Sequence, residues 1–125
     1  MSPYRVVTDN LIPSFSRNVK KLRRKYRRID SDLGKVFDKI AEDPFNSRHA
    51  TPLVGFNRTI WKYRCLSSDQ KTGESGGFRI LCYVDSENES IYPLAVWSKS
   101  QIPGQLKNAE IEKLIDMLSS QSNLE

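Results

Sequence analysis

Length, composition and charge predict a small soluble domain. With 125 residues, 38% hydrophobic and 28% charged, the chain is expected to form a single domain over residues 1–125 with one core. No apolar run approaches the roughly 20 residues of a membrane-spanning helix. The first five residues lack the apolar core of a signal peptide, so we expect a cytoplasmic protein.

The scarcity of cysteine and histidine excludes several kinds of site. The chain has two cysteines and one histidine, His49. These are too few for a conventional zinc site, and they do not supply a Ser-His-Asp or Cys-His nucleophile unless His49 acts alone from its loop. We therefore expect no metal and no cofactor.

Positive charge is concentrated in the N-terminal part of the chain. The formal net charge is +5, and seven of the nine residues 20–28 are Lys or Arg. Such a density attracts phosphate backbones through counterion release, and it would attract an acidic protein partner equally. Neighbouring like charges on a helix repel, which favours a binding role over a merely solvated face. The candidate RNA-binding residues of this run are Lys20, Lys21, Arg23 and Arg24.

The first half of the chain predicts a strand followed by two helices. Residues 4–8 have the composition of a short strand that ends at residues 9 and 10. A first helix, capped by Ser14, is predicted by apolar residues at spacings of four and three: Phe15, Val19, Leu22, Tyr26 and Ile29. A second helix has acidic residues in its first turn, a stop at Pro44, and its own stripe: Leu33, Val36, Phe37 and Ile40. The short connection predicts an antiparallel helical hairpin.

The second half predicts three consecutive antiparallel strands and a last helix. Residues 44–58 are expected to be irregular, and the strands are predicted at 59–65, 78–85 and 91–99, with a polar, Gly-rich loop at 66–77. Pro93 cannot donate to a sheet ladder, so it predicts a strand start, a bulge or an edge. After a break at 101–104, a helix capped by Asn108 is predicted by its apolar face: Ile111, Leu114, Ile115 and Leu118.

This order of elements predicts an α+β fold with an N-terminal strand, a helical hairpin, a three-stranded antiparallel meander and a C-terminal helix. The two cysteines, Cys65 and Cys82, fall on adjacent predicted strands. They could lie opposite each other and form a cross-strand disulfide, although buried free thiols are favoured in a reducing cytoplasm.

Four cations occupy strand positions where β-branched or aromatic side chains are usual. Alternation puts Lys62 and Arg64 on one face of the first strand of the meander, and the bulky apolar residues of that strand on the other. Arg79 begins the second strand and Lys99 ends the third. One such residue on an exposed strand is ordinary, but four on adjacent strands favour a site for an anion.

Taken in order, these segments resemble the RelE/ParE superfamily of toxins from type II toxin–antitoxin modules, and most closely its RelE-like and HigB-like mRNA interferases. The resemblance covers nearly the whole chain and rests on the opening strand, the basic hairpin and residues 61–64, 76–83, 96–100 and 108–111. It implies a RelE-like, microbial-RNase-like fold. It also implies a ribosome-dependent endoribonuclease that inhibits translation by cleaving mRNA in the ribosomal A site, and a cognate antitoxin partner.

By position, the resemblance implies catalytic roles for Lys62, Arg64, Arg79 and Lys99. The reaction is attack of a ribose 2′-hydroxyl on the adjacent phosphate, with departure of the 5′-oxygen. Lys62 would take the hydroxyl proton, Lys99 would protonate or stabilise the leaving oxygen, and the two guanidinium groups would hold the phosphate.

Further RNA contacts are expected from Arg58 and from base stacking on Tyr83 and Trp97, although aromatic residues at strand spacing are more often part of the core. The implied partners are the antitoxin, the ribosome and mRNA, with no membrane and no small-molecule cofactor.

Two other interpretations stay open. One is a ParE-like inhibitor that poisons DNA gyrase by binding, against which the four cations argue. The other is a non-catalytic module of the same fold that binds nucleic acid or protein. It is favoured by the absence of a Tyr or His immediately after Lys99, where related toxins often carry one.

Overall fold

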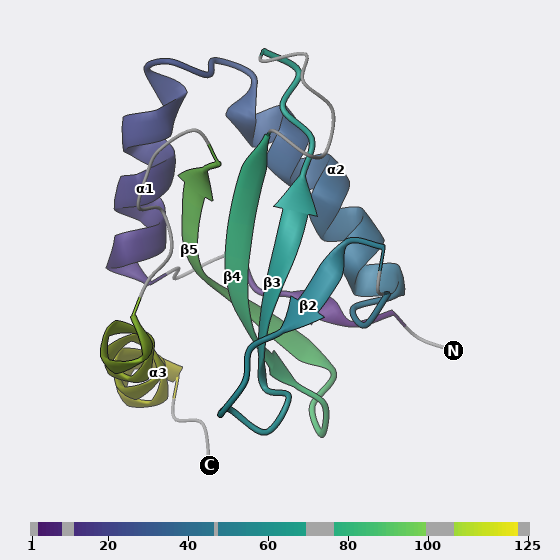
Figure 1. The fold of residues 1–125 in the computed structure, drawn as a ribbon, viewed down its shortest axis with the longest axis vertical. Helices are drawn as coiled ribbons and strands as arrows, with labels where there is room; N and C mark the ends of the chain where they lie inside the picture. The colour runs from purple at the N-terminus through teal and green to yellow at the C-terminus, as the bar shows by residue number, and fades with distance from the viewer. Residues whose placement is uncertain (1–2, 9–11, 47, 70–76, 100–106, 123–125) are drawn as a thin grey trace.

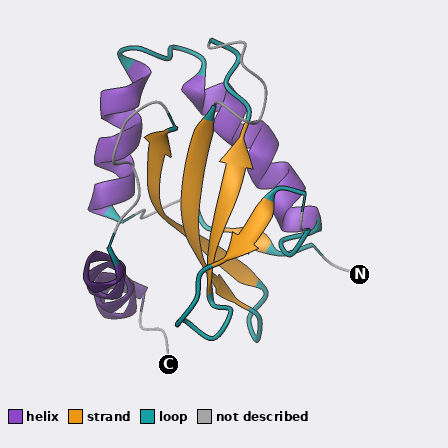
Figure 2. Cartoon of the chain, in the orientation of Figure 1, coloured by secondary structure: helices purple, strands orange, loops and turns teal. Residues whose placement is uncertain are grey.

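A five-stranded sheet with helices on both faces organises the molecule (Figure 1). The computed structural model describes residues 3–8, 12–46, 48–69, 77–99 and 107–122. Its elements are β1 (Arg5–Val6), α1 (Pro13–Arg23), α2 (Ile29–Glu42), β2 (Ala50–Pro52), β3 (Ile60–Cys65), β4 (Phe78–Asp85), β5 (Ser90–Ser98) and α3 (Asn108–Ser122). This arrangement confirms the predicted α+β class (Figure 2). None of the helices in these ranges is long and apolar enough to cross a membrane.

The strand order is β1-β5-β4-β3-β2. The predicted meander is present, because β3, β4 and β5 pair antiparallel in sequence order, and β1 joins β5 in parallel. The prediction of an irregular segment over 44–58 was wrong at 50–52, where β2 pairs with β3. A strand of three residues ending in proline has too little alternation to be predicted from sequence.

Each face of the sheet has its own apolar core. On one face, α1 and α2 run in opposite directions and cover side chains such as Tyr63, Phe78 and Ile80 (Figure 1). On the other, Ile60 and Leu81 pack in a second cluster with the buried face of α3: Ile111, Leu114 and Leu118. The predicted apolar face of the last helix is thereby confirmed. Strand alternation also holds, since the side chains of β3 and β4 divide between the two cores as period two requires.

The helical hairpin differs from the prediction at its turn. The first helix ends at Arg23, so Tyr26 lies in the connection and Ile29 opens α2 instead of continuing the stripe of α1. Both side chains are nevertheless buried. The Tyr26 ring packs edge-on against Phe78, with ring centroids 5.2 Å apart, and its hydroxyl lies 3.4 Å from Ser98 Oγ. Contact with the sheet therefore overrides the helical spacing of this stretch.

The predicted caps at Ser14 and Asn108 were also wrong. Ser14 lies inside the first turn of α1, where its hydroxyl donates to the Leu94 carbonyl at 3.1 Å, and Asn108 is already helical. One helical turn beyond Ser14, the Asn18 side chain accepts from the Val96 N–H at 3.1 Å. Two side chains of α1 thus form hydrogen bonds with backbone groups of β5 beyond the two residues of β5 that pair with β1.

Pro93 lies next to a β-bulge, one of its three predicted settings. Cys82 pairs with Pro93 whereas the preceding Leu81 pairs with Ala95, so β5 holds one extra residue at this point.

The two cysteines do not lie opposite each other, because Cys65 faces Phe78 and Cys82 faces Trp61 across the ladder. Both are free and buried, as the favoured alternative predicted. The first strand is shorter than the predicted 4–8, because β1 covers only Arg5–Val6. The remaining expectations, the loop over 70–76, the break at 101–104 and a frayed end at 123–125, lie outside the described residues.

Candidate functional site

The ladder between β3 and β4 places two arginines directly opposite each other. Arg64 pairs with Arg79, and Arg79 pairs in turn with Trp97 of β5, so the three form one row across the sheet. The adjacent row on the same face contains Lys62 and Leu81. Three of the four predicted catalytic residues therefore lie together on the face away from the helical hairpin. The pairing register, which the sequence could not supply, is what brings them together.

Arg79 is the most buried member of the row, with 9% of its surface exposed. Its Nη1 donates to the Phe78 carbonyl at 3.1 Å. Burial, and secondarily the charge of Arg64, lower the pKa of the Arg79 guanidinium. Like charges directly opposite each other on a sheet are destabilising. The pair therefore disfavours its own charges and favours a bound anion that would neutralise them.

Lys99 follows the end of β5 and is exposed. Its backbone N–H donates to the Gly77 carbonyl at 3.0 Å, which continues the pairing of β4 and β5 by one residue. Alternation along β5 puts Lys99 on the same side of the sheet as Trp97 and the arginine row. All four predicted catalytic cations thus belong to one end and one face of the sheet.

The end of the sheet that carries these cations depends on a close backbone approach at Gly77. This residue has φ of +49°, and a Cβ there would overlap the carbonyl oxygen of Cys65. Only glycine fits without displacing the end of β3.

Segment 67–69, immediately after β3, is tied to α2 by two carboxylates. Asp32, buried in the first turn of α2, accepts from the Ser68 N–H at 2.9 Å and from the Ser68 hydroxyl at 2.6 Å. Asp69 accepts from the Arg28 N–H at 2.9 Å, at the N-terminus of α2. These bonds hold the segment that follows Arg64 in place. The sequence could not distinguish the buried Asp32 from an ordinary acidic residue in the first turn of a helix.

The two predicted stacking residues are half-buried in the second core. Trp97 and Tyr83 both pack against the cluster that contains Ile60, Leu81 and the apolar face of α3. Trp97 borders Arg79 in the same row, whereas Tyr83 is two rows further along, opposite Ile60 and Tyr92. Only Trp97 is therefore adjacent to the arginine pair.

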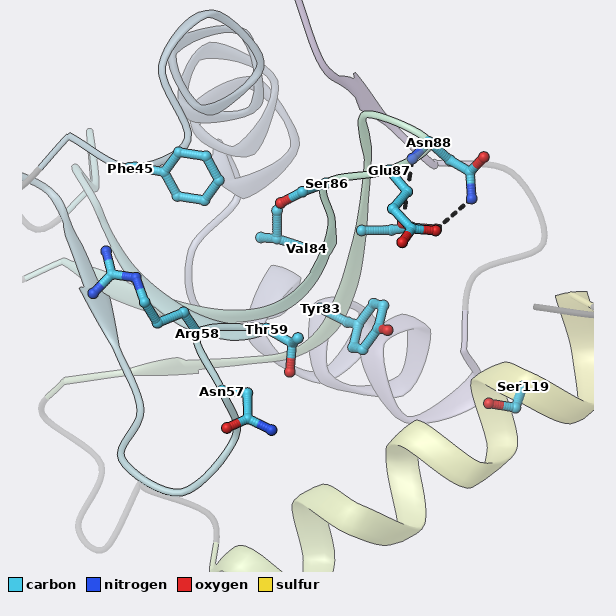
Figure 3. A pocket seen from close by; sticks show the side chains of 11 residues that line it. Phe45, Asn57, Arg58, Thr59, Tyr83, Val84, Ser86, Glu87, Asn88 and Ser119 are labelled. Atoms are coloured by element: carbon cyan, nitrogen blue, oxygen red, sulfur yellow. Dashed lines mark hydrogen bonds between the residues drawn. The ribbon is translucent and has the colours of Figure 1, made fainter. Parts of the chain in front are cut away.

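Arg58 does not join the cluster of cations. It lies in the connection between β2 and β3 with φ of +59°, and its guanidinium stands 5.0 Å from the centre of the Trp61 ring. Arg58 and Tyr83 line a hollow of about 660 Å³ at the other end of the sheet, together with Phe45, the turn that joins β4 to β5, and Ser119 of α3 (Figure 3). Figure 3 shows Arg58 on the opposite side of this hollow from Glu87 and Asn88.

The four predicted basic residues of the hairpin are exposed at the C-terminal end of α1. That end lies towards the ends of β3 and β5 (Figure 1). Arg23 is engaged within the hairpin, because its Nε and Nη2 donate to Asp30 at 2.7 and 2.9 Å. The hydrogen bond from Arg23 lowers the pKa of the Asp30 carboxyl. Lys20, Lys21 and Arg24 are thus the members of the set for which no such bond is seen among the described residues.

His49, for which no role was predicted, has a buried Nε2 with no hydrogen-bond partner in the described part of the chain. It lies just before β2, and its carbonyl accepts from the Arg64 N–H at 3.0 Å. The burial of this nitrogen could not be predicted from sequence, because a single histidine in an irregular segment has no periodic pattern around it.

Chemically, the arrangement suits an anion with several oxygens. Two guanidinium groups and two ammonium groups supply fork-shaped and point-like donors on one face. Across the described ranges, no three His, Cys, Asp or Glu side chains gather as a metal site would require.

The sequence matches no protein-family model and no curated relative. Among solved structures, the chain is similar to the toxin–antitoxin complex RelBE2 from Mycobacterium tuberculosis. The TM-score is 0.55 at 20% sequence identity, and the match covers 78% of this chain and 99% of the other. At this identity the similarity concerns the fold, and it confirms the RelE-like fold that the sequence resemblance implied.

Proposed function

We propose that this chain is the toxin of a type II toxin–antitoxin module, and that it acts in the cytoplasm as a ribosome-dependent endoribonuclease on mRNA. The observation that carries the proposal is the direct opposition of Arg64 and Arg79 on the face that bears Lys62. Like charges directly opposite each other on a sheet are destabilising, and one of these guanidinium groups is largely buried, so a bound phosphate that neutralises them would stabilise the arrangement. The RelE-like fold supports the same class of protein.

In the proposed reaction the two arginines hold the scissile phosphate and stabilise the negative charge that develops on it. A guanidinium group can donate two hydrogen bonds to two phosphate oxygens, and it stays charged at any working pH. Lys62 accepts the proton of the ribose 2′-hydroxyl, whose oxygen then bonds to phosphorus. The bond to the 5′-oxygen breaks, and Lys99 donates a proton to that oxygen or stabilises its negative charge. The products are a 2′,3′-cyclic phosphate and a 5′-hydroxyl.

The remaining surfaces have separate roles in this proposal. The exposed cations of α1, chiefly Lys20, Lys21 and Arg24, contact ribosomal RNA, because they project from the hairpin and not from the face that holds the scissile phosphate. Trp97 offers its exposed part to a base next to that phosphate. An antitoxin protein holds the activity in check by covering these surfaces.

The experiment is primer extension on a defined mRNA in a purified translation reaction, with and without ribosomes. Wild type is compared with Arg79→Ala and with Lys113→Ala, a matched loss of charge on the exposed side of α3. We expect new 5′ ends within codons that require ribosomes, persist in Lys113→Ala and fall by at least about 10²-fold in Arg79→Ala. Unchanged cleavage in Arg79→Ala would reject the catalytic role.

If the wild type binds ribosomes or a partner protein but cleaves nothing, the non-catalytic interpretation replaces the nuclease. If it inhibits gyrase instead, the ParE-like interpretation does.

A further inference from the structure

A second pocket adjoins the arginine pair at the edge of the sheet. It has a volume of about 350 Å³ and lies between α2 and the end of β3. Its walls include Lys35 and Lys39 of α2, His49, Arg64, and Leu66 and Ser68 beyond β3. Arg64 belongs both to this pocket and to the row with Arg79. The two sites are therefore neighbours that share one residue.

One residue that lines the pocket, His49, has a polar atom that the protein does not satisfy within the described residues. Nε2 of His49 is buried without a hydrogen-bond partner there, and the imidazole ring lies 6.3 Å from the Tyr63 ring, centre to centre. Buried polar atoms are nearly always hydrogen-bonded, so each exception requires an explanation. A ligand oxygen in the pocket would provide one, because an imidazole N–H donates readily to phosphate.

The charges that line the pocket favour an anion. Lys35 and Lys39 are four residues apart, which puts both ammonium groups on one face of α2, and Arg64 adds a third cation. Two carboxylates also line the pocket, Asp32 and Asp38. Both oxygens of Asp32 already accept hydrogen bonds from Ser68, so its charge is partly compensated.

We propose that this pocket binds a second phosphate group of the RNA strand, next to the one held between Arg64 and Arg79. The proposal rests on the proposed function, because it places the RNA on the arginine row. His49 donates from Nε2 to a phosphate oxygen, while Lys35 and Lys39 neutralise its charge. The RNA then passes around the end of β3, beyond the residues of β3 that pair with β2. His49 and the two lysines are binding residues here, without a part in the bond-breaking step.

The single histidine of the chain makes a direct test possible. Its imidazole resonances are followed by NMR in the full-length protein while inorganic phosphate is added at constant pH and ionic strength, with chloride as the matched salt. We expect a saturable shift of the His49 Nε2 and Cε1–H signals. In Lys39→Ala and in Lys35→Ala the apparent dissociation constant should rise about three- to tenfold. Lys113→Ala is the control and should leave it unchanged.

The same signals are then followed with a short single-stranded RNA in which every 2′-hydroxyl is methylated, so that cleavage cannot occur. We expect the shift again, and a salt dependence of binding that is shallower by about 0.7 in log–log slope in Lys39→Ala. A shift with inorganic phosphate but none with RNA would mean that the pocket binds small anions only, and the RNA proposal would fail.

Two further outcomes separate this inference from the proposed function. If Arg79→Ala abolishes cleavage while the His49 response persists, both stand. If the wild type cleaves mRNA but His49 responds to neither ligand, or responds equally in the lysine variants, the second phosphate site is rejected and the nuclease is kept. A His49 response in a wild-type protein that does not cleave would reject the nuclease and leave the phosphate site in place.

Discussion

The repulsion between the two opposed arginines gives the sharpest test of the site. Residues directly opposite on antiparallel strands have Cβ atoms about 5 Å apart, and we consider a separation of about 6 Å between the two charges. At that separation two unit charges repel by about 0.7 kcal/mol at the dielectric constant of water, and by about 3 kcal/mol at an effective value of 20. Because Arg79 is largely buried and Arg64 is exposed, we expect a value between these limits.

The perturbation is a double-mutant cycle with Arg64→Met, Arg79→Met and both together. Methionine keeps the apolar stem and removes the charge. The free energy of unfolding is measured by urea titration at low salt and again in 0.5 M NaCl, a concentration chosen to screen exposed charges. We expect an unfavourable coupling of about 1–2 kcal/mol at low salt that shrinks at high salt. Inorganic phosphate should stabilise the wild type more than the double variant, which keeps only the pocket beside α2.

A coupling near zero, or a favourable one, would refute this reasoning. It would mean that the two guanidinium groups are held apart or are already neutralised, and the pair could then not serve as the phosphate clamp on which the nuclease proposal depends. Losses specific to either single variant, such as the bond from Arg79 to the Phe78 carbonyl, cancel in the cycle.

Three further predictions concern the surroundings of the site. Gly77→Ala should lower the free energy of unfolding by at least about 2 kcal/mol in a urea titration, because the positive φ of Gly77 and its contact with β3 exclude a Cβ. In the same titration Gly34→Ala should raise the free energy of unfolding by about 0.5–1 kcal/mol, because Gly34 lies inside α2 with open space around it. Asn18→Ala should cost about 1–3 kcal/mol, because a backbone N–H of β5 loses its acceptor; no loss would show that water replaces the side chain. Arg23→Ala should weaken ribosome binding less than Lys21→Ala in a sedimentation assay, since Arg23 already binds a carboxylate of α2, and the reverse order would contradict this.

The predictions from sequence were correct where they rested on patterns among neighbouring residues. Strand alternation correctly separated Lys62 and Arg64 from the side of β3 that packs against the helical hairpin, and Phe78–Asp85 was predicted with its exact ends. The apolar face of α3 was likewise correct. These are properties of neighbouring residues, fixed by the period of a helix or a strand.

The failures came where distant contacts override such periods. Tyr26 continues the spacing of α1 but leaves the helix to pack on Phe78, and β2 exists only because β3 offers it a partner.

The class of fold, the order of the long elements and the identity of the four predicted site cations could therefore be inferred from the residues alone. The three-dimensional structure was needed to show that Arg64 faces Arg79, that Arg58 belongs to a different hollow, and that His49 lines a pocket with Arg64. Register and burial depend on pairing between residues far apart in the chain. A shift of one residue in the ladder would have left the composition and the periodicity unchanged and dispersed the site.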